Sequence, residues 1–384
     1  MKKVKLGEVC EIVTGSTPKS TNPDYWNGEY KWITPAEISD DDFIIVDTQR
    51  KISKLGIEKT GLKSFPIGTV LFSSRAPIGK VAIAGCEMYC NQGFKNFICS
   101  NEINNEYLYY FLKSRKNFLN NIGRGATFKE ISKSIISNIE IILPSYNVQC
   151  TQTQNLKKID NLIYLRKKVI KEYQLLVKSR FNELFGDDSK FDVERLNNSV
   201  TEMFIGPFGS SLKNDYFVSK EKAYCMVYEQ KHAIKKTMNL ETRYVDEKKY
   251  KELKRFSIYG GDIIVSCRGT IGEIYQVPNN APLGIMHPSI MKIRLDNSKY
   301  NPIFFKFMLS DYMDIEKNKS KGSGVKMAIT ASELGKIKFP LPPLSLQNEF
   351  ADFVAQVDKS QLAIQKSLEE LETLKKSLMQ DYFG

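Results

Sequence analysis

Apolar side chains recur every seven residues along two stretches of the chain that lack glycine and proline, residues 148–185 and 346–383. A heptad pattern sustained over this length is typical of a coiled-coil seam. We therefore expect two long helices whose seam consists of Leu156, Ile163, Ile170, Val177, Val357, Ile364, Leu371 and Leu378.

The two expected helices differ in charge and in the position of their apolar stripe. Residues 150–186 carry eight Lys and Arg against three Asp and Glu, whereas residues 346–384 carry four against seven. Arg166 and Arg180 stand where the second helix has Ile364 and Leu378. Opposite net charge and unlike seams favour pairing of the helices with each other over pairing of each with a copy of itself. The alternative, separate packing of each helix on its own domain, would require an equally long groove.

The segments that precede each long helix have the pattern of short strands separated by glycine and proline. Strands are expected at residues 43–48, 69–74, 80–84 and 96–100, and then at 262–266, 272–277 and 289–295. A shorter helix is expected in each half, at residues 106–120 and 302–318.

The second half of the chain repeats the first at an offset of 198 residues, or 193 locally. Residues 74–79 (SRAPIG) face residues 267–272 (CRGTIG), and Gln149 faces Gln347. The repeat predicts an α+β fold with a pseudo-twofold internal repeat, in which two β-rich domains are separated by a pair of long coiled-coil helices. The expected domain ranges are 1–147, 148–186, 187–345 and 346–384.

The chain is basic, with a net charge of +12 over 384 residues. A basic chain attracts polyanions, and nucleic acid is the commonest polyanion in cytoplasm. The excess of cations is found in both β-rich parts, with 19 against 15 acids in residues 1–149 and 25 against 19 in residues 187–345. No apolar run is long enough to span a membrane, and seven scattered cysteines suit a reducing, cytoplasmic location.

The motifs of an enzyme are missing from the sequence. An adenine methyltransferase would carry Asn/Asp-Pro-Pro-aromatic, and a nucleotide-binding loop would end in Gly-Lys-Ser/Thr after an upstream glycine; neither occurs. Two histidines, His232 and His287, give little material for a zinc site. We expect no catalytic residue and no metal ligand in this chain.

Candidate DNA contacts are basic residues in glycine-containing loops of the repeat. Arginine suits bidentate contact with guanine or a grip on phosphate, and glycine lets backbone approach phosphate closely. A structural role, in which the arginines satisfy loop carbonyls, is an equal alternative for Arg75 and Arg268. The candidates are Arg75, Lys80, Arg124, Lys129, Arg268, Lys321 and Lys326.

Several short motifs, in this order and partly in duplicate, resemble the specificity subunit of type I restriction-modification systems. They are residues 6–9 (LGEV), 15–18 (GSTP), 32–34 (WIT), 65–71 (FPIGTVL), 74–80 (SRAPIGK), 178–186 (KSRFNELFG) and 341–344 (LPPL) with Gln347. The resemblance covers the whole chain.

The resemblance implies that each β-rich domain is a target recognition domain reading half of a bipartite site in double-stranded DNA. It implies an antiparallel pair of helices that spaces the domains and docks two modification (methyltransferase) subunits. Restriction subunits would join the complex, and S-adenosylmethionine, ATP and Mg would bind those partner subunits and not this chain. Two other functions stay open from the residues: a restriction or modification enzyme with its own active site, and a coiled-coil scaffold that binds no DNA.

Overall fold

The computed structural model describes residues 2–123, 129–323 and 330–384, and the chain divides into two compact units. Unit 1 consists of Met1–Val169 and Ile364–Gly384, and unit 2 of Ile170–Ala363. Each of the two long helices belongs partly to both units.

Unit 1 is built from short strands followed by helices. Its elements are β1 (Lys2–Lys5), α1 (Leu6–Val9), β2 (Cys10–Val13), β3 (Trp26–Ile33), β4 (Ile44–Ile45), β5 (Arg50–Ile52), α2 (Lys54–Thr60), β6 (Val70–Phe72), β7 (Val81–Ala84), β8 (Tyr89–Cys90), β9 (Asn96–Cys99), α3 (Asn105–Ser114), α4 (Lys116–Ile122), α5 (Lys133–Ser137), β10 (Glu140–Leu143) and the first part of α6 (Tyr146–Phe185). The last part of α11 (Leu344–Phe383) also belongs to this unit. The strands form sheets of order β2-β9-β6-β7-β4, β5-β3-β8 and β1-β10.

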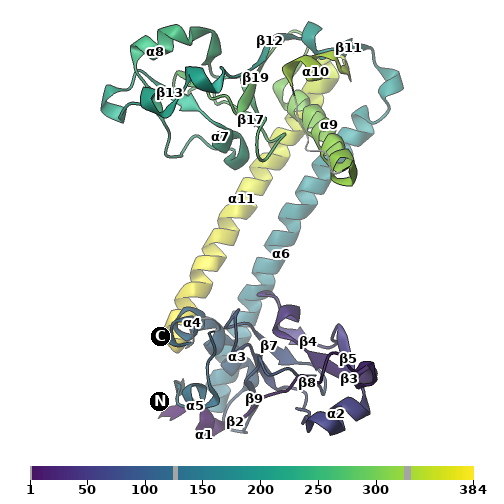
Figure 1. Cartoon of the computed structure of the whole chain (residues 1–384), viewed down its shortest axis with the longest axis vertical. Coiled ribbons are helices and arrows are strands. Elements are labelled where there is room, and N and C mark those ends of the chain that lie inside the picture. The colour runs from purple at the N-terminus through teal and green to yellow at the C-terminus, as the bar shows by residue number, and fades with distance from the viewer. Residues whose placement is uncertain (1, 124–128, 324–329) are drawn as a thin grey trace. The chain divides into compact units, whose positions relative to one another are not determined.

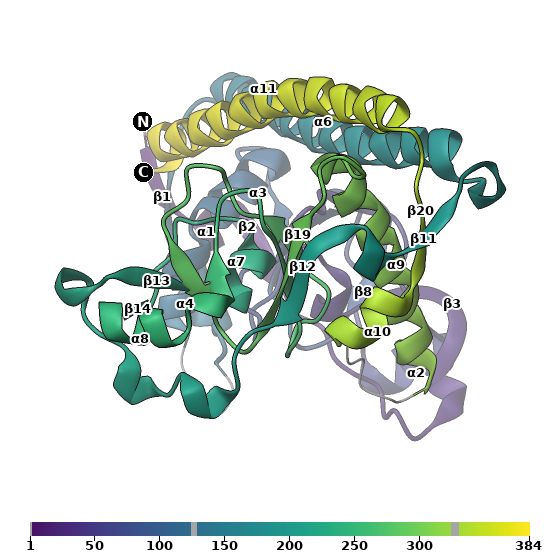
Figure 2. The same cartoon turned by 90° about the horizontal axis from the view of Figure 1, so that it is seen from above.

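Unit 2 repeats this arrangement. Its elements are the last part of α6, then β11 (Val193–Arg195), β12 (Val200–Ile205), β13 (Cys225–Tyr228), α7 (Gln230–Lys235), β14 (Tyr244–Val245), α8 (Glu247–Glu252), β15 (Ser257–Ile258), β16 (Ile263–Ser266), β17 (Ile274–Gln276), β18 (Gly284–Met286), β19 (Ile290–Leu295), α9 (Pro302–Ser323), α10 (Ala331–Lys336), β20 (Lys338–Pro340) and the first part of α11 (Leu344–Phe383). The sheets are β12-β19-β16-β17, β14-β13-β18-β15 and β11-β20. Figures 1 and 2 show β13 and α8 on one side of β12 and β19, with α9 and α10 on the other.

The two units share one pattern of strand pairing. The run β2-β9-β6-β7 corresponds to β12-β19-β16-β17, with every pair antiparallel. The pair β3 and β8 is parallel, as is the pair β13 and β18. The predicted α+β fold with an internal repeat is therefore confirmed.

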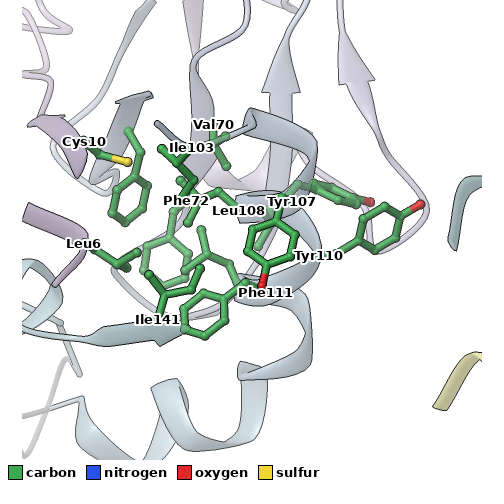
Figure 3. Close-up of a cluster of buried hydrophobic side chains, with 14 of the residues drawn as sticks. Leu6, Cys10, Val70, Phe72, Ile103, Tyr107, Leu108, Tyr110, Phe111 and Ile141 are labelled. Carbon is green, nitrogen blue, oxygen red and sulfur yellow. The ribbon is translucent and has the colours of Figure 1, made fainter. Parts of the chain in front are cut away.

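The core of unit 1 gathers around α3 (Figure 3). Tyr107, Leu108 and Phe111 of α3 are buried against Val70 and Phe72 of β6. Leu156 of α6 and Phe383 of α11 belong to the same buried cluster. Burying such side chains stabilises the fold by about 1.5–3 kcal/mol each. Both long helices are thereby fixed to the β-rich part of unit 1.

A buried glutamine fixes the start of each long helix in the same way. The side-chain amide of Gln149 donates to the carbonyls of Glu102 and Pro144, both at 3.0 Å, and its oxygen accepts from the Asn104 N–H at 2.8 Å. Gln347 donates to Lys299 and Pro342 and accepts from Asn301 at 2.8–2.9 Å. The two halves of the sequence repeat therefore form equivalent hydrogen bonds at these glutamines.

Within each unit the long helices α6 and α11 pair antiparallel (Figures 1 and 2). In unit 1, Asp160 meets Lys375 at 2.5 Å and Lys167 meets Glu372 at 3.3 Å, so the numbering rises along one helix while it falls along the other. In unit 2, the Arg180 guanidinium contacts Glu349 at 2.7 Å. Two of these three ion pairs join a basic α6 residue to an acidic α11 residue, in line with the expected charge complementarity.

The predicted seam residues differ in how deeply they are buried. Leu156, Ile163, Val177 and Val357 are buried. Ile170, Ile364, Leu371 and Leu378 are partly exposed. Leu156 also joins the core of unit 1, and Val177 and Val357 join that of unit 2, because the helices pack on the β-rich parts as well as on each other.

Some expected boundaries were wrong. The strand expected at 43–48 is only the two-residue β4, and the helix expected at 106–120 is broken into α3 and α4 at Arg115. Arg115 leaves helical geometry (φ −95°, ψ 9°), and its guanidinium donates to the Phe383 carbonyl. That partner is 268 residues away, so no local sequence pattern could reveal the break.

Candidate nucleic-acid interface

One serine shapes the arginine-bearing turn in each unit. The Ser73 hydroxyl donates to the Pro77 carbonyl and accepts from the Lys80 N–H, both at 2.8 Å. The Ser266 hydroxyl donates to Thr270 at 2.6 Å and accepts from Glu273 at 2.9 Å. These bonds place Arg75 and Arg268 at equivalent positions, as the local offset of 193 predicted.

Glycine closes both of these turns. Gly79 and Gly272 have φ values of 92° and 78°, a left-handed conformation that other residues rarely adopt. Their N–H groups donate to the carbonyls of Ser73 at 3.0 Å and Ser266 at 2.8 Å. The turn is therefore held by backbone and serine atoms, and the arginine side chain is not needed to form it.

Three further loops converge on each turn, joined by backbone hydrogen bonds. In unit 1, Ser74 donates to Gly93, Asn91 to Ile33, and Ser16 to Cys90, at 2.8–3.2 Å. In unit 2, Cys267 donates to Ser289 and His287 to Tyr228, both at 2.9 Å. A Cβ atom on Gly15 would lie 1.7 Å from the Cys90 oxygen, and one on Gly206 would lie 2.3 Å from the His287 oxygen. Only glycine permits these approaches.

We call these gathered loops the rims. The unit 1 rim comprises residues 14–18, 34–37, 74–80 and 91–93, and the unit 2 rim residues 206–211, 229–232, 267–272 and 287–289. They gather because the strands before them, including the parallel pairs β3/β8 and β13/β18, end at the same edge. Each rim is thus a compact set of loops on a rigid β scaffold, the arrangement on which binding residues commonly lie.

The unit 2 rim presents an unpaired cation. Arg268 is exposed, and within the described residues its guanidinium has no hydrogen bond or ion pair. Phe208 in the neighbouring loop is 87% exposed. Glu229 is buried and paired with Arg243 and with Lys231, the latter at 2.8 Å.

The imidazole of His287 at this rim lies near charges of both signs. Burial lowers the pKa of His287 below 6.5; Glu229 opposes the shift, and the nearby cations Arg243, Arg268 and Lys231 add to it. His232 is fully buried, and burial lowers its pKa as well. Both imidazoles are therefore neutral at pH 7, and Arg268 stays the rim cation that has no partner among the described residues.

The unit 1 rim is more constrained. Arg75 is 43% exposed, and its Nε contacts Glu130 at 2.9 Å. The Lys80 ammonium donates to the Pro35 carbonyl at 2.9 Å, which ties two rim loops together. Lys80 corresponds to Glu273 in unit 2, so the two rims do not share a cation at this position.

The remaining predicted contacts are less well placed. Lys129 is exposed and lies directly after the undescribed residues 124–128. Arg124 and Lys326 lie outside the described residues, and Lys321 belongs to α9 but its side chain is not described. All seven residues therefore stay predictions as DNA contacts.

Glu130 and Phe208 were missed by the sequence reasoning. Phe208 sits in the run Gly206-Pro207-Phe208-Gly209, and an aromatic residue between turn residues is a signal that could have been used. Glu130 gave no signal, because its partner Arg75 is 55 residues away.

The described part of the chain has neither a cluster of metal-ligating side chains nor a membrane-spanning helix. Across residues 2–123, 129–323 and 330–384, no three His, Cys, Asp or Glu side chains gather in a way that could hold a metal ion. Among the helices of the described part, none is both long and apolar enough to cross a lipid bilayer.

The chain matches the family model described as the type I restriction modification DNA specificity domain, over residues 1–174 and 232–374. It is 35% identical over 193 residues to the type I restriction enzyme MjaIX specificity subunit of Methanocaldococcus jannaschii, a match that covers 50% of this chain and 45% of the relative. It is 23% identical over 297 residues to the MjaVIII specificity subunit of the same organism, covering 71% of this chain and 68% of that one. The match to the MjaIX subunit thus spans less than half of that relative's length.

Solved structures share the fold. The chain aligns with the S subunit of a type I restriction-modification system from M. genitalium with a TM-score of 0.55 and 17% identity, covering 100% of this chain and 96% of that one. A chain from a structure described as the basis of complex assembly and conformational transition of the type I R-M system gives a TM-score of 0.67 at 17% identity, covering 99% and 97%.

Proposed function

Because the chain belongs to the family of type I restriction modification DNA specificity domains, we propose that it is the DNA-reading subunit of such a system. The unit 1 rim reads one half of a bipartite site in double-stranded DNA, and the unit 2 rim reads the other half. The observation that carries the proposal is the duplicated rim, in which the same hydrogen bonds present Arg75 and Arg268 from two self-contained units.

The chain performs no chemistry itself in this proposal. Two modification subunits bind along α6 and α11, one for each copy of the repeated helix, and restriction subunits complete the assembly. S-adenosylmethionine, ATP and Mg bind those partner subunits. Exposed apolar residues on α6, among them Leu162, Leu165 and Leu176, supply surface for such contacts.

A domain exchange tests the proposal. Residues 1–145 are replaced by the same region of another family member, the complex with modification subunits is assembled, and methylated sites are mapped across a genome. One half-site changes, while the other half-site and the spacing between them stay the same. A change in both half-sites, or no sequence-dependent methylation by the unaltered complex, contradicts the two-rim function.

Salt dependence provides a second measurement. Lys and Arg contacts with phosphates release counterions, so the binding constant for DNA falls steeply as salt rises. A binding constant that does not change with salt would favour a scaffold without DNA contacts.

A further inference from the structure

The Glu130 carboxylate lies between two cations of unit 1. Its Oε2 accepts from Arg75 Nε at 2.9 Å, and its Oε1 meets the ammonium of the buried Lys95 at 3.1 Å. The backbones of Arg75 and Glu130 form an antiparallel bridge, and Ile131 donates to the Ser74 carbonyl at 2.9 Å. Glu130 is therefore held from its backbone and from both carboxylate oxygens.

This contact fixes one edge of the Arg75 guanidinium and leaves the other free. Only Nε is engaged, and in the described residues neither Nη atom has a protein partner. The side chain stays 43% exposed, so the Nη atoms can meet a ligand. A planar guanidinium with two parallel donors matches a pair of acceptors such as guanine O6 and N7.

The ion pairs of Glu130 with Arg75 and Lys95 are not among the contacts that the turns of both units share. The rim hydrogen bonds align Gly93 with Ser289, which places Met291 opposite Lys95. Aligning Ile131-Ser132 with Ile329-Thr330 places Ala328 opposite Glu130. Unit 2 forms the same turn without either residue, so Glu130 is not required for the turn itself.

We propose that Glu130 is a positioning residue that aims the Nη edge of Arg75 at the O6 and N7 of one guanine. The inference rests on the proposed function, since it names the base class that unit 1 reads. It also implies that the half-site read by unit 1 contains one position at which guanine is required strictly.

Four variants test the role of Glu130: Arg75→Ala, Glu130→Gln, the double variant of both, and Lys95→Met. Each is assembled with modification subunits and competed against duplexes in which every half-site position is replaced in turn. Arg75→Ala lowers the preference for guanine at one position by roughly tenfold. Glu130→Gln lowers it several-fold at the same position, and adding it to Arg75→Ala changes nothing more, because Glu130 acts through Arg75.

Lys95→Met is the matched control, because it removes the other partner of Glu130 and leaves the contact with Arg75. It keeps the base preference of the unaltered complex even where it changes thermal stability. If Glu130→Gln leaves Lys95 buried without a partner and unit 1 unfolds, the double variant Glu130→Gln with Lys95→Met restores a neutral interior and shows the same loss of preference as Glu130→Gln.

Two results would overturn the inference. One is an unchanged guanine preference in a folded Glu130→Gln variant; the other is an equal loss in Lys95→Met. In both cases a complex that still reads two half-sites leaves the proposed function standing. A complex without any sequence preference would instead reject the proposed function.

Discussion

At the scale of single residues, Arg268 is the clearest candidate for a DNA contact. It is exposed at the unit 2 rim, and in the described part of the chain it has no hydrogen bond or ion pair. Arg268→Ala should therefore weaken binding of the specific duplex by about 1–3 kcal/mol if the arginine reads a base. Fluorescence anisotropy at fixed salt measures the change. Arg195→Ala, an exposed arginine of β11 away from the rim, is the control; an equal loss there would mean that only overall charge matters.

His232 makes unit 2 sensitive to acid. Burial lowers its pKa below 6.5 in the folded state, so below pH 6.5 the unfolded chain binds more protons than the folded one. The free energy of unfolding of unit 2 should fall as pH drops through this range, by at most about 1.4 kcal/mol per pH unit for one histidine. His287 adds to the effect in the same direction.

Hydrogen exchange at pH 7.5 and pH 5.5 measures this loss separately for each unit. Unit 1 contains no histidine, and Glu37 accepts the Thr34 N–H at the place corresponding to His232. Unit 1 is therefore the internal control, and equal acid destabilisation of both units would exclude the histidines as the cause.

The sequence predicted the equivalence of Arg75 and Arg268 because both follow a strand at the same place in the repeat. It did not predict their unequal surroundings. The ion pair between Arg75 and Glu130 joins residues 55 positions apart, and the loop with Phe208 differs in sequence from the corresponding residues 14–18. Composition and local order cannot report such contacts.

At the scale of elements, the glutamine at the start of each long helix fixes that helix to its unit. Gln149→Ala would remove the partner of one buried and two partly buried backbone groups, so it should destabilise unit 1 by about 2–3 kcal/mol. Thermal unfolding measures the loss, and Gln347→Ala should produce the same loss in unit 2. The exposed Gln154, on the same helix, is the control, and its alanine variant should stay within about 0.5 kcal/mol. Similar values for Gln149 and Gln154 would contradict the anchoring role.

The boundaries of the long helices were predictable because local residue types set them. The long helices begin at Tyr146 and Leu344, two residues before the expected starts, and end directly before Gly186 and Gly384. Strong periodicity and an absence of glycine and proline made them predictable. The break at Arg115 and the short β4 depend on tertiary contacts, which outweigh the local preference.

At the scale of the whole molecule, α6 and α11 are the elements that both units share. Four residues inserted after Lys168, matched by four in α11 before Ile364, would add about 6 Å to each helix. The preferred spacer between the half-sites should lengthen by about two base pairs, since DNA advances about 34 Å per turn of 10–10.5 base pairs. Methylation mapping of the variant measures the spacer, and an unchanged spacer would mean that the helices do not set it.

The serine-centred turn has a consequence for how such proteins evolve. The hydrogen bonds that form it come from Ser73 or Ser266 and from backbone atoms, and its surroundings already differ between the two units. Mutation or recombination can therefore replace the side chains that the turn presents while the hydrogen bonds that form the turn are kept. A lineage can acquire a new DNA target one half at a time, and it retains the old half-site while the other diverges. Within a single gene, the residues that form the turn can thus be inherited unchanged while the side chains that the turn carries vary.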